Sequence, residues 1–223
     1  MNQEIKSLTD KFDSMRLVYD KDIDSLSQVI QFGEHLLDIA YQSELKDVAS
    51  YVAHCLLIPY DERARYYRHY GKYDRAKHPK DLEQSIRDYS RVIDLAPVAL
   101  NGKTDDHYGK IRLAFEGRCE CFLEIDVIDR AISDAEFIIK KYGDSQAYIL
   151  RSKCYFSAKD FDLANRDIIQ AIEIIKNKDD ITNQWNLSDA IEMQNKIRAI
   201  LNKTAHRLTA VSRDQEKTRP GNL

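Results

Sequence analysis

The chain has 223 residues, enough for one sizeable domain or two small ones, and 32% of them are charged. Only 7 glycines and 4 prolines occur, and scarce helix breakers with abundant charge are typical of an all-helical protein. The formal net charge of −3 argues against wholesale nucleic-acid binding but leaves room for a local basic patch.

Residues 1–60 are predicted to form N-terminal helices. Apolar residues spaced three to four apart predict a first helix over 2–19. A second helix is expected over 24–41, where apolar side chains cover most of the circumference and indicate burial. Ser43 is expected to start a third helix, and Pro59 to end it.

Residues 61–97 are predicted to form a pair of helices. The second helix, over 81–96, has a regular apolar pattern that ends just before a proline. The first helix, over 62–76, is rich in tyrosine and does not fall into clean register with later segments. An inserted loop is expected over 98–110, because Asn101-Gly102 is a turn signal.

Residues 112–176 contain an internal repeat with an offset of 33 residues. At this offset similar residues align: Phe115 with Tyr148, Arg118 with Arg151, Cys121 with Cys154, Ala131 with Ala164 and Asp134 with Asp167. A repeat of about 34 residues with two helices per unit predicts an array whose neighbouring units stack to bury a shared apolar face.

The second copy, residues 145–176, resembles a tetratricopeptide repeat. Its first helix carries large aromatic residues and a small residue at the places this family uses, Tyr148, Ser152 and Tyr155. Its second helix carries small residues, including Ala164, that let the two helices approach closely. The first copy, residues 112–143, fits the same pattern.

The resemblance extends to 61–97 and, loosely, to a degenerate repeat over 25–57. It implies an all-α fold, a tetratricopeptide-like helical repeat array (α-solenoid) with an extra N-terminal helix. Residues 187–210 are expected to form the C-terminal capping helix that such arrays need. Residues 211–223 are polar and are predicted to be a disordered tail.

Catalytic and metal-binding patterns are absent from the sequence. The six histidines are scattered, and neither a phosphate-binding glycine loop nor a nucleophile elbow occurs. Cys119 and Cys121 are two residues apart on one predicted helix and point to different faces, which favours packed core thiols over metal ligands. We therefore predict no enzyme activity, no catalytic residue, no metal site and no cofactor.

Compartment signals are few. Residues 1–20 hold no apolar segment of the kind found in secretory signals, and no apolar run approaches the roughly 20 residues of a membrane span. The four cysteines lie within helical patterns, so we expect reduced thiols. These features predict a cytoplasmic protein that does not bind membranes.

The resemblance also implies which residues face a partner, because the first helix of each tetratricopeptide repeat lines the inner, concave face. The inward positions of the 112–143 repeat are Leu113, Glu116, Gly117, Glu120, Leu123 and Glu124. Those of the 145–176 repeat include Ile149, Lys153 and Phe156. The three glutamates form an acidic stripe, either a solvated helix face or part of a groove for a basic and partly apolar peptide.

Residues 63–80 are strongly basic, with four interleaved tyrosines. The candidate patch in this stretch consists of Arg65, Arg68, Lys72 and Arg75. Basic groups attract phosphates and aromatic faces can stack on bases. Alternatively, the tyrosines pack between repeats beneath a solvated basic face.

The sequence thus predicts a non-catalytic protein-interaction module, an adaptor, scaffold or chaperone that binds a partner's peptide or helix in a concave groove. The alternative is a regulator that uses 63–80 to bind nucleic acid or an acidic partner. Terminal helices of repeat arrays often pair, so residues 2–19 could form a dimer contact.

Overall fold

The computed structural model describes residues 3–18, 22–71, 78–100, 109–177 and 183–217. All regular secondary structure within these ranges is α-helical, as predicted. The helices are α1 Gln3–Val18, α2 Ile23–Gln42, α3 Lys46–Gly71, α4 His78–Ala99, α5 Lys110–Glu124, α6 Ile128–Tyr142, α7 Ser145–Ser157, α8 Phe161–Lys176 and α9 Asn183–Lys217. The chain divides into two compact units. The first, Met1–Val127, holds α1 to α5, and the second, Ile128–Leu223, holds α6 to α9.

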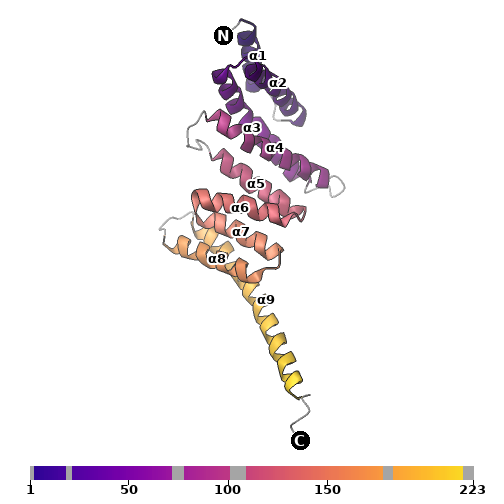
Figure 1. Ribbon diagram of the computed structural model, residues 1–223, viewed down its shortest axis with the longest axis vertical. Helices are drawn as coiled ribbons and strands as arrows, with labels where there is room; N and C mark the ends of the chain where they lie inside the picture. The colour runs from indigo at the N-terminus through magenta and orange to yellow at the C-terminus, as the bar shows by residue number, and fades with distance from the viewer. Residues whose placement is uncertain (1–2, 19–21, 72–77, 101–108, 178–182, 218–223) are drawn as a thin grey trace. The chain divides into compact units, whose positions relative to one another are not determined.

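In the first unit each helix packs against the next, and α3 also reaches α5 (Figure 1). Two ion pairs fix the direction of α5 relative to α3. Lys110 contacts Asp61 near the start of α5, and Arg68 contacts Glu120 further along both helices. The two helices are therefore parallel neighbours, with α4 packed against each of them.

Small residues set the spacing in the core of this unit. Gly33 on α2 faces Phe12 of α1 and Leu56 of α3, and a Cβ at residue 33 would lie 2.6 Å from a Leu56 methyl group and 2.8 Å from the Phe12 ring. Since Phe12 and Leu56 are fully buried, the glycine lets α1, α2 and α3 meet around one core.

In the second unit α6 packs on α7, α7 on α8 and α8 on α9, and α7 also reaches α9. Asp144 and Asp160 cap α7 and α8, accepting hydrogen bonds from the backbone N–H groups of Ala147 and Leu163. The core of this unit joins α7, α8 and α9, and its buried members are Ile149, Ala164, Ile168, Ala171, Ile172, Ile175, Ala190 and Ile197.

The same tight turn ends α2, α5 and α7. Its central residue has a positive φ in each case: 55° at Glu44, 61° at Asp126 and 63° at Lys159. The next N–H donates back to a carbonyl of the preceding helix, as from Val127 to Phe122 (2.8 Å) and from Asp160 to Tyr155 (2.9 Å). These hydrogen bonds define a Schellman motif.

An arginine joins the two helices of a pair in both units. Arg63 on α3 lies over the Tyr60 ring and donates two hydrogen bonds of 2.8 Å to Asp88 on α4. Arg151 on α7 lies over two tyrosine rings and donates bonds of 2.7 and 2.8 Å to Asp167 on α8. Each bidentate pair links the helix that carries the arginine to a nearly buried carboxylate on the facing helix.

Three predicted helix ends were wrong. The prolines expected to stop helices at Pro59 and Pro97 lie inside α3 and α4. Proline costs a helix about 3 kcal/mol, but α3 buries Leu57, Tyr60 and Ala64 around Pro59, so packing offsets this cost. Residues 211–217 of the predicted disordered tail are helical, since α9 continues to Lys217.

The remaining boundaries differ less. The helix predicted over 2–19 corresponds to α1, and the predicted capping helix lies within α9. The boundary between the two units falls inside the predicted repeat 112–143, between Val127 and Ile128. Most of the predicted loop 98–110 lies outside the described residues.

Candidate functional site

The candidate site is a groove between the parallel helices α3 and α5. Two adjoining pockets of about 210 and 360 Å³ form it, and both are lined by Arg68 and Glu120. The remaining lining residues are Asp61, Arg65, His69, Tyr89, Leu113, Glu116, Gly117, Leu123 and Glu124. We call these eleven residues the α3/α5 groove.

Gly117 and Tyr89 form the floor of this groove. A Cβ at residue 117 would lie 2.3 Å from Cζ of the Tyr89 ring and 2.6 Å from its hydroxyl oxygen. Glycine is therefore required for the ring of α4 to reach the backbone of α5. Tyr89 is only 2% exposed, and burial raises the pKa of its hydroxyl well above the usual value.

A buried carboxylate lies at one end of the groove. Asp61 is 1% exposed, and its Oδ2 accepts hydrogen bonds from Lys110 Nζ at 2.8 Å and Arg65 Nη2 at 3.0 Å. The Arg65 side chain is 51% exposed, so the cation is the member of the pair that meets solvent. Two cations thus face one carboxylate here.

The charges are reversed at the other end. Arg68 pairs with Glu120 across the groove, and Glu124, one turn further along α5, is exposed. The Glu120 side chain is 44% exposed against 22% for Arg68, so the carboxylate is the member that meets solvent. Midway, Glu116 accepts a 2.8 Å hydrogen bond from Arg112 of its own helix.

All six inward positions predicted on α5, including Gly117, line the groove. The predicted acidic stripe is not a row of free carboxylates, because Glu116 and Glu120 each face an arginine. Sequence reasoning did not assign Asp61 or Tyr89 to a binding surface, since Asp61 belongs to no recognisable motif and Tyr89 lies on the second helix of its predicted pair, whereas the resemblance puts first helices on the concave face.

The predicted inward residues of α7 have three different environments. Ile149 is 2% exposed and belongs to the core with α8 and α9, so its assignment to a partner-binding surface was wrong. Lys153 is exposed. Phe156 is half-buried and its ring packs edge-on against Phe161, with centroids 5.5 Å apart.

The predicted basic patch is described only in part, because Lys72 and Arg75 lie outside the described residues. Arg65 and Arg68 pair with Asp61 and Glu120 and are members of the groove. Positive charge in this stretch is thus partly neutralised by carboxylates of α3 and α5.

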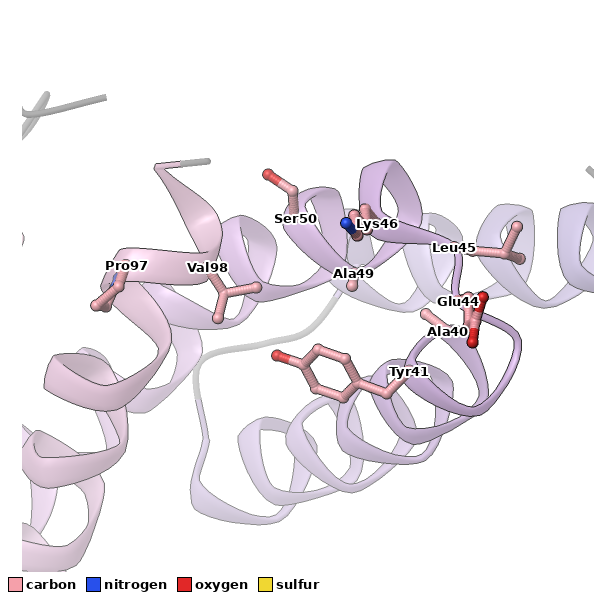
Figure 2. A pocket seen from close by; sticks show the side chains of 9 residues that line it. All are labelled: Ala40, Tyr41, Glu44, Leu45, Lys46, Ala49, Ser50, Pro97 and Val98. Carbon is pink, nitrogen blue, oxygen red and sulfur yellow. The ribbon is translucent and has the colours of Figure 1, made fainter. Parts of the chain in front are cut away.

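A larger pocket of about 620 Å³ lies where α2 ends, α3 begins and α4 ends (Figure 2). Tyr41 from α2 and Val98 from α4 point toward each other there, beside Ala49 of α3. Its other lining residues are Ala40, Glu44, Leu45, Lys46, Ser50 and Pro97. This pocket is mainly apolar and lacks the paired charges of the α3/α5 groove.

Over the described part of the chain, His, Cys, Asp and Glu side chains do not gather in threes in a way that could hold a metal ion. All four cysteines are buried free thiols. Burial raises the pKa of Cys121 to about 11, so this thiol is protonated at neutral pH. Among the described helices, none combines the length and apolar character needed to cross a membrane.

No family model matches the chain, and no curated protein matches it. Among solved structures, it is similar to a chain described as BtubC (BKLC) from P. vanneervenii, with 15% sequence identity and a TM-score of 0.46. The similarity covers 98% of this chain and 93% of that one. A similarity at this level does not identify the family or the function.

Proposed function

We propose that the protein is a non-catalytic protein-interaction module, an adaptor, scaffold or chaperone, that binds a segment of a partner protein in the α3/α5 groove. The observation that carries the proposal is the groove itself. Two parallel helices present charged, polar and apolar side chains around a floor where the Tyr89 ring lies against Gly117. Concave sites with a few fixed polar groups are typical of ligand recognition.

We also propose that the helices form a tetratricopeptide-like repeat array. Alternate helices α3 and α5 lie side by side while α4 packs behind both, which is the arrangement such arrays use to line a concave face. The recurring Schellman turns and arginine–aspartate pairs support repetition of one structural unit. Buried free thiols are consistent with a reducing, cytoplasmic environment.

Exposed apolar residues add to the case for a protein partner. Leu113 lines the groove and is 46% exposed, and Ile58 on α3, also 46% exposed, lies one turn before Asp61. Apolar anchors beside charged groups are typical of protein interfaces. The nucleic-acid alternative is less well supported, because Arg63, Arg65 and Arg68 each pair with a carboxylate.

An affinity pull-down from native lysate with quantitative mass spectrometry tests this proposal. Leu113→Arg places charge and bulk in the groove at an exposed position. Ile169→Arg on α8, where the isoleucine is 36% exposed, is the matched control outside the groove. We expect at least one protein to be lost with Leu113→Arg and retained with Ile169→Arg. Identical captured proteins with all three chains would contradict the proposed site.

A further inference from the structure

The hydroxyl of Tyr89 opens into the smaller pocket of the α3/α5 groove. Tyr89 is 2% exposed and lines this pocket of about 210 Å³, with its ring against Gly117. Among the described residues, none forms a hydrogen bond with this hydroxyl. The side-chain nitrogen and oxygen atoms of these residues that are both sealed from solvent and without a hydrogen bond are Arg16 Nε and Asn165 Oδ1. The Tyr89 oxygen is therefore not sealed but reaches the pocket.

A hydroxyl of this kind is unusual in a core. Tyr60, the other buried tyrosine of the described residues, donates a hydrogen bond of 2.9 Å to Glu34. Buried polar groups normally have such a partner, because a polar group taken out of water without one costs free energy. A buried hydroxyl that lacks an internal partner and opens into a pocket is thus a candidate for contact with a bound molecule.

The chemistry of this hydroxyl is that of a neutral phenol. Burial raises the pKa of Tyr89 well above its ordinary value, so the group keeps its proton at neutral pH. A phenol can donate one hydrogen bond and can also accept one.

The charged side chains around the pocket already have partners within the chain. Arg65 pairs with Asp61, Arg68 pairs with Glu120, and Glu116 accepts a hydrogen bond from Arg112. A charged side chain from a partner would compete with one of these pairs, and breaking a partly buried pair is costly. A neutral side chain that both donates and accepts can bind without breaking any of them, because a paired carboxylate still has free lone pairs.

From these observations we infer that the pocket binds the primary amide of an asparagine or glutamine side chain of the partner segment. The Tyr89 hydroxyl donates to the amide oxygen, and the amide N–H groups donate to the carboxylates of Glu116 or Glu120, which line the same pocket. Sites for whole small molecules are usually about 300–1,000 Å³, so a pocket of about 210 Å³ suits one side chain. This inference rests on the proposed function and names the chemistry of the partner.

The stability of the chain without a partner gives the first test. Tyr89→Phe removes only the hydroxyl, so we expect the urea midpoint to stay unchanged or rise. Tyr60→Phe is the matched control, because it removes a hydroxyl that bonds Glu34 and should lower the midpoint. A lower midpoint with Tyr89→Phe would mean that its hydroxyl has a partner inside the fold, and this would overturn the inference.

Selection from a phage-displayed library of random 12-residue peptides, with the full chain as bait, gives the second test. We expect the selected peptides to share an asparagine or glutamine at one position. A synthetic peptide with that residue replaced by an apolar one of similar size, leucine for asparagine or methionine for glutamine, should bind roughly tenfold more weakly.

The two peptides and two variants together locate the contact. Tyr89→Phe should bind the amide peptide roughly tenfold more weakly than the wild type does, and should no longer distinguish it from the apolar peptide. Tyr60→Phe, whose ring lies outside the groove, should keep the wild-type preference. Circular dichroism must show equal helicity in all three chains.

The outcomes separate the inference from the proposed function. Peptides that lose binding with Leu113→Arg, but share no amide or bind Tyr89→Phe as well as the wild type, would overturn the inference and leave the groove as the binding site. Peptides that bind Leu113→Arg as well as the wild type would contradict both, as would a selection that enriches no peptide.

Discussion

Gly117 lies where the backbone of α5 comes closest to the Tyr89 ring. Replacing a helical glycine with alanine usually stabilises a helix by up to about 1 kcal/mol. Here the new methyl group would lie 2.3 Å from the ring, and overpacking of this kind costs about 1–3 kcal/mol. We therefore expect Gly117→Ala to lower the free energy of unfolding, measured by urea denaturation.

A second substitution checks the cause. Tyr89→Leu removes the ring and creates space, so the double variant Gly117→Ala/Tyr89→Leu should be more stable than the sum of the two single changes predicts. If Gly117→Ala alone is neutral or stabilising, the ring does not press on α5 and the described floor of the groove is wrong.

Asp167 is the nearly buried partner of Arg151. Removing it leaves a guanidinium that is 21% exposed without its bidentate acceptor. We expect Asp167→Ala to destabilise the chain by about 2 kcal/mol in urea denaturation. Glu83→Ala is the control, because the pair of Glu83 and Arg87 is 61% exposed on both sides and 3.9 Å apart, and its loss should cost less than about 0.5 kcal/mol. Equal effects would contradict a special role for the bidentate pair.

The repeat offset of 33 residues aligned Arg151 and Asp167 with residues of the first copy, but the sequence alone did not reveal that Arg151 bonds Asp167. Arg118 aligned with Arg151 and Asp134 with Asp167, and nothing in the spacing says that one side chain bonds the other. The structure adds a second instance at Arg63, which lies over the Tyr60 ring and bonds Asp88 as Arg151 lies over its tyrosines and bonds Asp167. The predicted helix over 62–76 excluded Tyr60, so this register was missed.

The turns that end α2, α5 and α7 share a residue with a positive φ, and substitution of that residue tests their geometry. Lys159 holds a φ of 63°, a conformation that costs residues with a side chain roughly 1 kcal/mol more than glycine. We expect Lys159→Gly to raise the free energy of unfolding by about 0.5–1 kcal/mol. Lys153→Gly, at another exposed lysine but inside α7, should lower it by about 1 kcal/mol.

Chemical denaturation of the full-length chains measures both changes in the free energy of unfolding. A loss of stability with Lys159→Gly would mean that the turn after α7 does not adopt the Schellman geometry. Asp126→Gly and Glu44→Gly extend the test to the turns after α5 and α2, where the same sign is expected.

Periodicity predicted which segments are helical, because each buried face recurs every three to four residues. The predicted helix ends at Pro59 and Pro97 were wrong, because the low helix propensity of proline favours a helix end and packing overrides it. Periodicity also placed Ile149 on the wrong surface, since the register of one helix does not say which neighbour covers it. In the structure Ile149 belongs to the core that α7, α8 and α9 share.

Alkylation of the buried cysteines follows unfolding of the whole molecule. Cys121 is fully buried and burial raises its pKa to about 11, so at pH 8 this thiol is protonated and out of reach of alkylating reagent in the folded chain. Burial also raises the pKa of Cys55. We expect iodoacetamide to label these cysteines at pH 8 only as the chain unfolds, so that labelling and loss of helical circular dichroism follow the same urea midpoint.

Mass spectrometry of the alkylated peptides measures this site by site. Rapid labelling of Cys121 in the absence of urea would contradict the packing of α5 against α4, since the Cys121 thiol lies 3.4 Å from the hydroxyl of Ser85 on α4.

The proposed function places the partner segment in the α3/α5 groove. Hydrogen–deuterium exchange of the full chain, with and without a partner protein captured in the pull-down, tests this site. Partner binding should slow exchange in residues 58–69 of α3 and 113–124 of α5 and leave exchange in α6 to α9 unchanged. Protection confined to α6–α9, or to the pocket between α2, α3 and α4, would contradict it.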